Sequence, residues 1–210
     1  MHLSGIKPWK SLNWPNRISL LRLLLVAPYF ILVLNQNDPD WRLARYGALV
    51  IFVVMALSDA LDGYLARRMD LRTRLGAILD PLADKVMIVC SAVLLTMPYS
   101  CVTAAPLPNW VVVLIVGKDL WVVLGFLVIY LVTDRFCVRP TAAGKVCTAV
   151  QSLLVGLTLL APDLNGLREG LGLLLARGAA WATAGACVLA AVSYGYLGLT
   201  FLAAEAKPLE

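Results

Sequence analysis

The sequence predicts an all-α integral membrane protein with six transmembrane helices and a short amphipathic helix on the membrane surface before them. Two observations lead to this prediction. Of the 210 residues, 60% are hydrophobic and only 15% are charged, which is too apolar for a soluble domain of this length. The hydrophobic residues also gather in six runs, each close to the roughly 20 residues that a helix needs to cross a bilayer core.

The six runs give the expected spans in chain order. They are Ile18–Leu34, Leu43–Asp62, Leu75–Met97, Trp110–Thr133, Gly144–Ala161 and Ala176–Ala203. No linker rich in Pro, Gly or Ser separates them, so one domain is expected over residues 17–205. Residues 1–16 combine apolar side chains with Lys7 and Lys10, which favours a short interfacial helix on an anionic leaflet; an unstructured basic leader is the alternative.

Clusters of positive charge predict the orientation in the membrane, because cytoplasmic connections carry an excess of Lys and Arg. These clusters stand before the first span, between the second and third, and between the fourth and fifth: Lys7, Lys10, Arg17, Arg67, Arg68, Arg72, Arg74, Arg135, Arg139 and Lys145. Both termini are therefore expected in the cytoplasm, as in a bacterial inner membrane or its equivalent. The net charge of +5 is interpreted as the positive charge that orients the spans in the membrane. The basic residues form no continuous stripe, which argues against nucleic-acid binding.

The cysteines and the one histidine predict no chemistry of their own. Five cysteines are scattered along the chain without a CxxC pair, so neither a zinc site nor a disulfide framework is indicated, and they are expected to be small buried hydrophobes. His2 stands at the N-terminal end, which excludes a histidine-based acid or metal site.

Four aspartates interrupt the apolar pattern near the end of the second span and the start of the third: Asp59, Asp62, Asp80 and Asp84. Residues three or four apart share one face of a helix, so these carboxylates form two pairs. Ionised carboxylates at membrane depth are costly unless they are paired or bind a metal, so this cluster is a candidate functional site. An all-oxygen ligand set favours Mg²⁺ or Mn²⁺.

The residues around the aspartates suit a nucleotide diphosphate. Gly63, Ala66 and Gly76 add no bulk, so a helix or a flat nucleotide ring can approach the backbone. Arg67 can pair with phosphate, and a bound cation neutralises the diphosphate and stabilises the leaving phosphate. Asp84, one turn beyond Asp80, is the candidate base that takes the proton of an attacking hydroxyl.

Pro81 allows two geometries for the third span. It either kinks a helix that began earlier or stands in the first turn of a helix that Asp80 caps, and the kink is favoured.

The complete pattern, Asp59-x2-Asp62-Gly63-x2-Ala66-Arg67-x8-Gly76-x3-Asp80-x3-Asp84, resembles the signature of the CDP-alcohol phosphatidyltransferase family at every fixed position. The segments NWPNRISLLR and AGKVCTAVQ are similar to parts of its phosphatidylglycerophosphate synthase and CMP-forming cardiolipin synthase branches. The resemblance implies six transmembrane helices, a homodimer and a site for two metal ions that is open to the cytoplasm. It also implies transfer of a phosphatidyl group from CDP-diacylglycerol to an alcohol, with release of CMP.

Family roles follow by position. The resemblance implies metal ligation by Asp59, Asp62, Asp80 and Asp84, with Asp84 also the catalytic base. It implies binding of the CDP group by Asp59, Asp62, Gly63, Ala66, Arg67 and Gly76.

Glycerol 3-phosphate is slightly favoured over phosphatidylglycerol as the acceptor alcohol, because Lys118 and Lys145 keep a positive charge at two positions that correspond to basic sites of the glycerophosphate branch. Candidate acceptor-binding residues are Lys118, Arg139 and Lys145, since a phosphorylated acceptor needs positive charge near the cytoplasmic side. Lys118 and its neighbour Asp119 are expected on different helix faces, so they need not neutralise each other. The chain has Gly117-Lys118-Asp119, Phe126 and Cys147 where the glycerophosphate branch tends to have further basic or acidic residues, so phosphatidylglycerol remains the alternative.

A cation transporter is the remote non-enzyme alternative, since its intramembrane carboxylates would bind an ion in transit. Such a site is expected near mid-membrane and beside internal repeats, whereas these carboxylates cluster at one edge of a chain without visible repeats.

Overall fold

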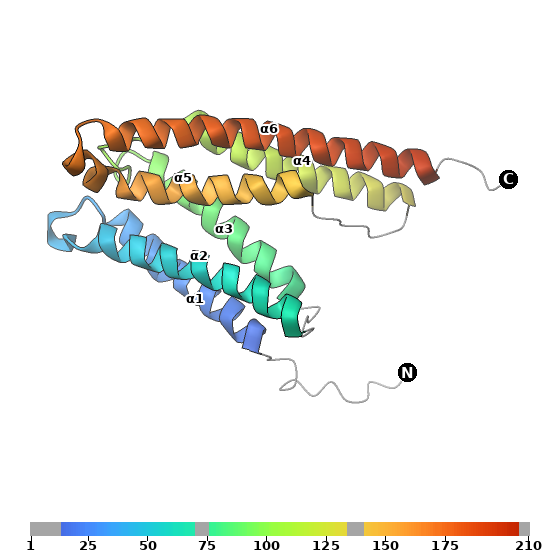
Figure 1. The fold of residues 1–210 in the computed structure, drawn as a ribbon, viewed down its shortest axis with the longest axis horizontal. Coiled ribbons are helices and arrows are strands. Elements are labelled where there is room, and N and C mark those ends of the chain that lie inside the picture. Colours follow the sequence, from blue (N-terminus) through green and yellow to red (C-terminus); the bar gives the residue numbers. More distant parts are fainter. Residues whose placement is uncertain (1–13, 70–75, 134–140, 206–210) are drawn as a thin grey trace. The chain divides into compact units, whose positions relative to one another are not determined.

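The computed structural model describes residues 14–69, 76–133 and 141–205, and within them the side chains of residues 21–58, 84–131 and 141–201. Every regular element in this part of the chain is helical, as predicted (Figure 1). The elements are α1 (Trp14–Leu34), the short 3-10 helix η2 (Pro39–Trp41), α2 (Ala44–Met69), α3 (Gly76–Thr96), α4 (Asn109–Thr133), α5 (Ala142–Leu167) and α6 (Leu171–Glu205).

The α-helices correspond one to one with the expected spans, but several of them run further. α2 continues past Asp62 to Met69, and α5 continues past Ala161 to Leu167 with Pro162 inside it. The alternative in which Asp80 caps the third span is wrong, because α3 already begins at Gly76. The expected interfacial helix falls mostly on residues 1–13, which lie outside the described residues.

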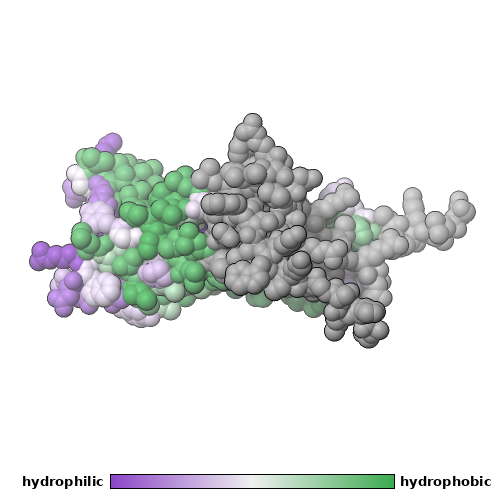
Figure 2. All heavy atoms as spheres, turned by 90° about the horizontal axis from the view of Figure 1, so that it is seen from below, coloured by the Kyte–Doolittle hydropathy of each residue, from purple (hydrophilic) through white to green (hydrophobic). Residues whose placement is uncertain are grey.

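Within the described residues, three helices are long and apolar enough to cross a membrane: residues 109–131 of α4, 142–167 of α5 and 171–201 of α6. Shorter apolar stretches, Leu21–Leu34 and Ala44–Ser58, belong to α1 and α2. Large apolar side chains are exposed along these helices, for example Leu131 and Val50. Figure 2 shows such side chains gathered on the described part of one face, with hydrophilic residues at its left-hand end. Exposed apolar side chains on long apolar helices indicate that lipid surrounds the protein.

The contacts divide the chain into two units, residues 1–94 and 95–210. In the first unit α1 packs against α2, where the rings of Tyr29 and Phe52 lie 6.2 Å apart. α1 also contacts α3, because the buried hydroxyls of Tyr29 and Ser91 are hydrogen-bonded at 2.9 Å. Tyr29 of α1 is fully buried and contacts both α2 and α3, so it connects the three α-helices of this unit.

In the second unit α5 and α6 form an antiparallel hairpin. The turn between them reaches Gly170, whose φ of +77° is a left-handed conformation that glycine adopts without strain. The side chain of Asn165 accepts a hydrogen bond of 2.7 Å from the backbone N–H of Gly172. α4 packs on α6, with the rings of Trp110 and Trp181 4.9 Å apart.

Gly172 is expected to be essential for this turn. A Cβ at this position would meet the carbonyl oxygen and backbone carbons of Ala161, which cannot move without moving α5. Gly172→Ala is therefore expected to lower the free energy of unfolding by about 1–3 kcal/mol, the usual cost of overpacking. The measurement is denaturant unfolding in detergent.

The matched control is Gly178→Ala on the same helix, where a Cβ meets nothing within 4 Å. Alanine is the better helix former, so this control should be neutral or slightly stabilising. Equal stability of the two variants would show that the close approach at Gly172 does not constrain the hairpin.

Candidate active site

The four aspartates lie on two consecutive helices. Asp59 and Asp62 stand in the C-terminal part of α2, and Asp80 and Asp84 stand in the N-terminal part of α3. Because both segments are helical, each pair shares one face of its helix. Asp84 is the member whose side chain the structure describes; those of the other three lie outside the described side chains.

The expected nucleotide-binding positions continue along the same two helices. Gly63, Ala66 and Arg67 follow the first aspartate pair on α2, and Gly76 is the first residue of α3. The connection between them, residues 70–75, lies outside the described residues. The fixed positions of the motif therefore lie at the C-terminal end of α2 and the N-terminal end of α3.

Asp84 forms an ion pair with Arg22 of α1. Arg22 Nη1 donates to Asp84 Oδ1 at 3.0 Å, and the side chain of Arg22 is only 1% exposed while that of Asp84 is 22% exposed. In apolar surroundings each charge requires the other, because an uncompensated buried charge is costly. The pair thus attaches the candidate base to a neighbouring helix through a short, directional contact.

Arg22 was missed as a site residue by the sequence reasoning. A signal did exist, since an arginine inside an apolar run indicates a buried partner or a polar pathway. Sequence alone could not show which acid it meets, because the two residues are 62 positions apart.

A second contact between α1 and α3 has the same separation. Tyr29 and Ser91 are also 62 positions apart, and each lies seven residues beyond the corresponding member of the Arg22–Asp84 pair. Seven residues are about two helical turns, so both contacts lie on the same helix faces. α1 and α3 therefore run parallel and in a defined register. This register fixes the height of Asp84 relative to α1.

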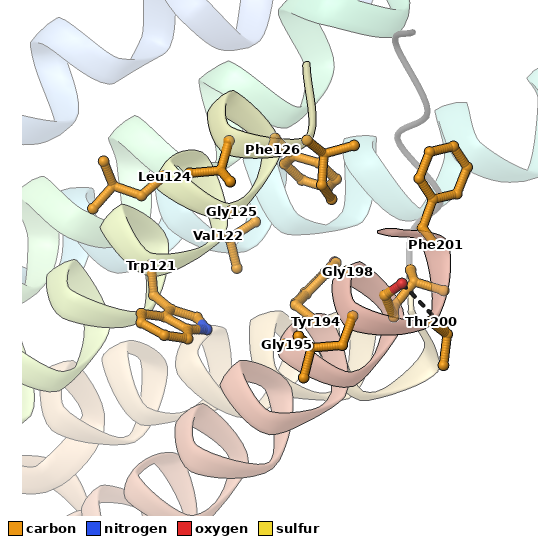
Figure 3. Close-up of a pocket in the computed structure, with 14 residues that line it drawn as sticks. Trp121, Val122, Leu124, Gly125, Phe126, Tyr194, Gly195, Gly198, Thr200 and Phe201 are labelled. Carbon is orange, nitrogen blue, oxygen red and sulfur yellow. Dashed lines mark hydrogen bonds between the residues drawn. The ribbon is translucent and has the colours of Figure 1, made fainter. Parts of the chain in front are cut away.

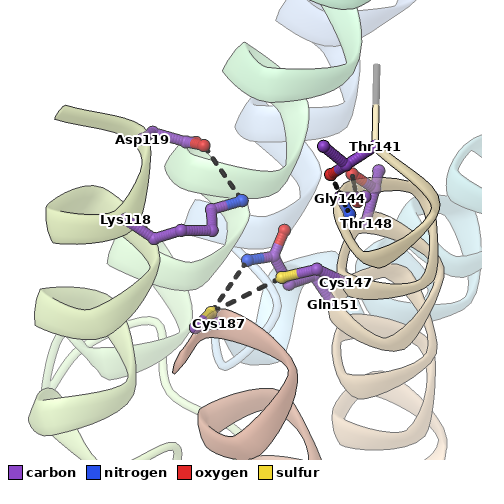
Figure 4. Close-up of polar contacts among 8 residues, drawn as sticks. All are labelled: Lys118, Asp119, Thr141, Gly144, Cys147, Thr148, Gln151 and Cys187. Carbon is purple, nitrogen blue, oxygen red and sulfur yellow. Dashed lines mark hydrogen bonds and ion pairs between the residues drawn. The ribbon is translucent and has the colours of Figure 1, made fainter. Parts of the chain in front are cut away.

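Lys118 on α4 is buried, and its Nζ lies 2.9 Å from Asp119 Oδ1. Helix geometry does not require these neighbours to neutralise each other, but in the structure they form an ion pair. The long lysine side chain can curve back toward its neighbour. Because Lys118 is buried away from water, its charge needs a partner, and Asp119 provides it. Figure 4 shows the pair beside side chains from two other helices.

Those side chains form a buried polar layer with Lys118. Cys147 Sγ on α5 lies 3.6 Å from Cys187 Sγ on α6, and Gln151 Nε2 donates to Cys187 Sγ at 3.4 Å (Figure 4). Lys118 is near enough to interact electrostatically with both sulfur atoms. The layer thus connects α4, α5 and α6.

The other expected acceptor-binding residues have different settings. Lys145 is exposed in the first turn of α5, which Thr141 caps by accepting a 3.1 Å hydrogen bond from Gly144 N–H. A Cβ at Gly144 would lie 2.5 Å from the hydroxyl oxygen of Tyr194, so a larger residue there would require the Tyr194 side chain to move. Arg139 lies outside the described residues. Of the three basic residues, the structure therefore describes Lys118, which is buried, and Lys145, which is exposed.

An apolar cavity of about 660 Å³ lies between α4 and α6 (Figure 3). Aromatic rings from both helices border it, with Phe126 and Tyr194 6.1 Å apart and edge to face. Its lining has no charged residue, and so it does not suit a phosphate or a metal ion. Phe126, one of the departures noted in the sequence, belongs to this hydrocarbon surface.

Metal ligation can be assessed only partly from the described side chains. Among them no group of three or more His, Cys, Asp or Glu could hold an ion. Asp84 nevertheless fits a ligand role, since it is a hard oxygen donor on the helix face shared with Asp80.

Comparison with known proteins adds independent information. A family model described as CDP-alcohol phosphatidyltransferase matches residues 12–194. The chain is 37% identical over 149 residues to a probable phosphatidylglycerophosphate synthase of Mycobacterium tuberculosis, covering 70% of this chain and 66% of that protein. It is also similar to proteins named CDP-diacylglycerol--glycerol-3-phosphate 3-phosphatidyltransferase. The one from Aquifex aeolicus is 36% identical (68% of this chain, 72% of that protein), and the one from Bacillus subtilis is 29% identical (70% and 77%).

Proposed function

Because the chain belongs to the CDP-alcohol phosphatidyltransferase family, we propose that it transfers a phosphatidyl group from CDP-diacylglycerol to glycerol 3-phosphate and releases CMP. The observation that carries this proposal is the acidic motif, complete at every fixed position and located on α2 and α3. The names of the three relatives support the choice of acceptor. The product is phosphatidylglycerophosphate, which places the protein in phospholipid synthesis.

The metal site in this proposal consists of Asp59, Asp62, Asp80 and Asp84. Their carboxylate oxygens suit two Mg²⁺ or Mn²⁺ ions. When bound, the ions neutralise the diphosphate and stabilise the departing phosphate of CMP. The protein's contribution is geometric, since two helix ends present the carboxylates at spacings of one turn.

Asp84 acts as the base in this mechanism. It accepts the proton of the primary hydroxyl as that oxygen bonds to the phosphorus carrying diacylglycerol. The bond between this phosphorus and the bridging oxygen breaks, and the bridging oxygen leaves with CMP. Arg22 holds Asp84 Oδ1 at 3.0 Å, and therefore fixes the direction in which the carboxylate faces.

The remaining substrate contacts follow the motif and the basic residues. Gly63, Ala66 and Gly76 give the cytidine access to the backbone, and Arg67 pairs with the diphosphate. Lys118, Arg139 and Lys145 bind the phosphate of the acceptor. The pairing of Lys118 with Asp119 leaves this region less positive than three free cations would, and this keeps phosphatidylglycerol as the alternative acceptor.

The proposed membrane arrangement is six transmembrane helices after an interfacial helix, with both termini and the site on the cytoplasmic side. The helix directions support it. α1 and α3 are parallel, and α5 and α6 are antiparallel, as the first and third and the last two of six successive spans must be. The enzyme is a homodimer in this proposal, on the family resemblance alone.

Metal removal tests the reaction. Purified protein given CDP-diacylglycerol, glycerol 3-phosphate and Mg²⁺ or Mn²⁺ is expected to release CMP, and EDTA is expected to stop the release until excess metal is added. The readout is CMP measured by chromatography. Release that continues unchanged in EDTA would contradict the metal role.

Competition between acceptors tests the product. With glycerol 3-phosphate and phosphatidylglycerol offered together, the mass of phosphatidylglycerophosphate is expected in the lipid extract; cardiolipin as the main product would favour the alternative. If neither acceptor, nor serine, nor inositol phosphate supports CMP release, the protein is not an enzyme of this kind. Metal-ion flux into vesicles would then be measured to examine transport.

A further inference from the structure

The two sulfur atoms in the buried layer of the second unit are in van der Waals contact. Cys147 Sγ and Cys187 Sγ lie 3.6 Å apart on two different helices, and both residues are almost completely buried. The helices are held against each other by the hairpin turn and by the close approach at Gly172. Forming a disulfide would require the sulfur atoms to approach by about 1.5 Å, since an S–S bond is about 2.05 Å long.

The surroundings of this pair differ from those of a purely apolar core. Gln151 donates a hydrogen bond to Cys187 Sγ, and Lys118 interacts electrostatically with both sulfur atoms. The donor beside Cys187 Sγ favours the thiolate of that residue, which is the form that reacts, while the charge of Lys118 is already paired with Asp119. A cysteine that only fills space needs no such donor.

We infer that Cys147 and Cys187 are a reversible redox site whose disulfide links α5 to α6 beside Lys118. Each thiol loses one proton and one electron, the S–S bond forms, and the two protons and two electrons reduce a quinone to its hydroquinone. A thiol reductant reverses the step by exchange.

The apolar setting favours a quinone as the oxidant. Both cysteines belong to helices long and apolar enough to cross a membrane, so an oxidant that dissolves in lipid is concentrated around them, whereas oxidised glutathione stays in water. Because both residues are almost completely buried between the helices, either oxidant has to enter through a transient opening of the helix packing. The inference therefore predicts a difference between two oxidants of different solubility.

The experiment uses the full chain in lipid vesicles, with Cys90, Cys101 and Cys137 replaced by serine so that only the pair remains. A fully substituted benzoquinone is added, because it cannot form adducts with thiols, and free thiols are counted after unfolding in detergent. The expected result is a change from two free thiols to none, which dithiothreitol reverses. Oxidised glutathione is expected to leave both thiols free.

Peptide mapping identifies the bond. Trypsin cuts after the exposed Arg168 in the turn, which separates Cys147 from Cys187 along the chain. The oxidised sample should contain one linked peptide pair, lighter by two hydrogens than the two separate peptides. The matched control moves the α5 thiol to a neighbouring exposed position by combining Cys147→Ser with Val146→Cys, and it should remain reduced.

Three results would overturn the inference: two free thiols after quinone treatment, equal oxidation by glutathione, or equal oxidation of the control. The site belongs to the second unit and its readout is the thiol count, so these results leave the proposed transferase reaction untouched. Conversely, absence of CMP release would leave the thiol result unchanged.

Discussion

Replacing Arg22 with methionine is expected to abolish turnover and to destabilise the protein. The change removes the guanidinium that donates to Asp84 Oδ1 at 3.0 Å. Removing one partner of a buried pair costs about 3–5 kcal/mol, and the partial exposure of Asp84 places the expected loss near the lower end of that range. The measurements are CMP release and denaturant unfolding in detergent.

A double variant separates the structural from the catalytic effect. Combining Arg22→Met with Asp84→Asn removes both charges, so most of the lost stability should return while turnover stays absent. The control is Arg42→Met, which removes an exposed arginine from the first unit and should leave stability and turnover near those of the parent. If the double variant is as unstable as the single one, the ion pair is not what Arg22 contributes.

Asp84→Asn alone is expected to reduce turnover by about 10²–10⁴-fold, the range that a positioned general base contributes. Asparagine keeps the size of the side chain and can still accept a hydrogen bond from Arg22, but it cannot take a proton from the acceptor hydroxyl. Binding of a CDP nucleotide should persist, because the other three aspartates and the small residues of α2 remain. Equilibrium dialysis with labelled CDP and the rate of CMP release give the two readouts.

The matched control for this substitution is Asp40→Asn, an exposed aspartate in η2 that precedes α2. Its turnover should stay within a factor of two or so of the parent, the scatter expected for surface changes. Turnover that survives in Asp84→Asn would identify another group as the base.

The helices themselves were predictable because lipid leaves the backbone few options. A segment that crosses hydrocarbon must satisfy its own hydrogen bonds, so each apolar run became a helix. The end of α5 was the weakest prediction, since Pro162 indicates a stop and yet the helix continues to Leu167. A proline inside a membrane helix is tolerated where neighbouring groups satisfy the released carbonyl.

The contacts between helices were not predictable in the same way. Arg22 and Asp84 meet only because α1 and α3 have one particular register, and nothing local to either residue determines it. The sequence left the pairing of Lys118 with Asp119 open, because the faces of a helix do not show how far a lysine side chain can bend toward its neighbour. Cys147 and Cys187 were predicted to be plain apolar residues, whereas only the folded hairpin places their sulfur atoms in contact.

The turn at Gly170 also bears on how the chain enters the membrane. In the proposed membrane arrangement a connection this short keeps the two helices together, so α5 and α6 are expected to insert as one hairpin. The charges before α5, after α6 and at the turn then determine one common orientation. Adding a positive charge beside Arg168 is expected to oppose the positive charge before α5, without altering any residue of the proposed site.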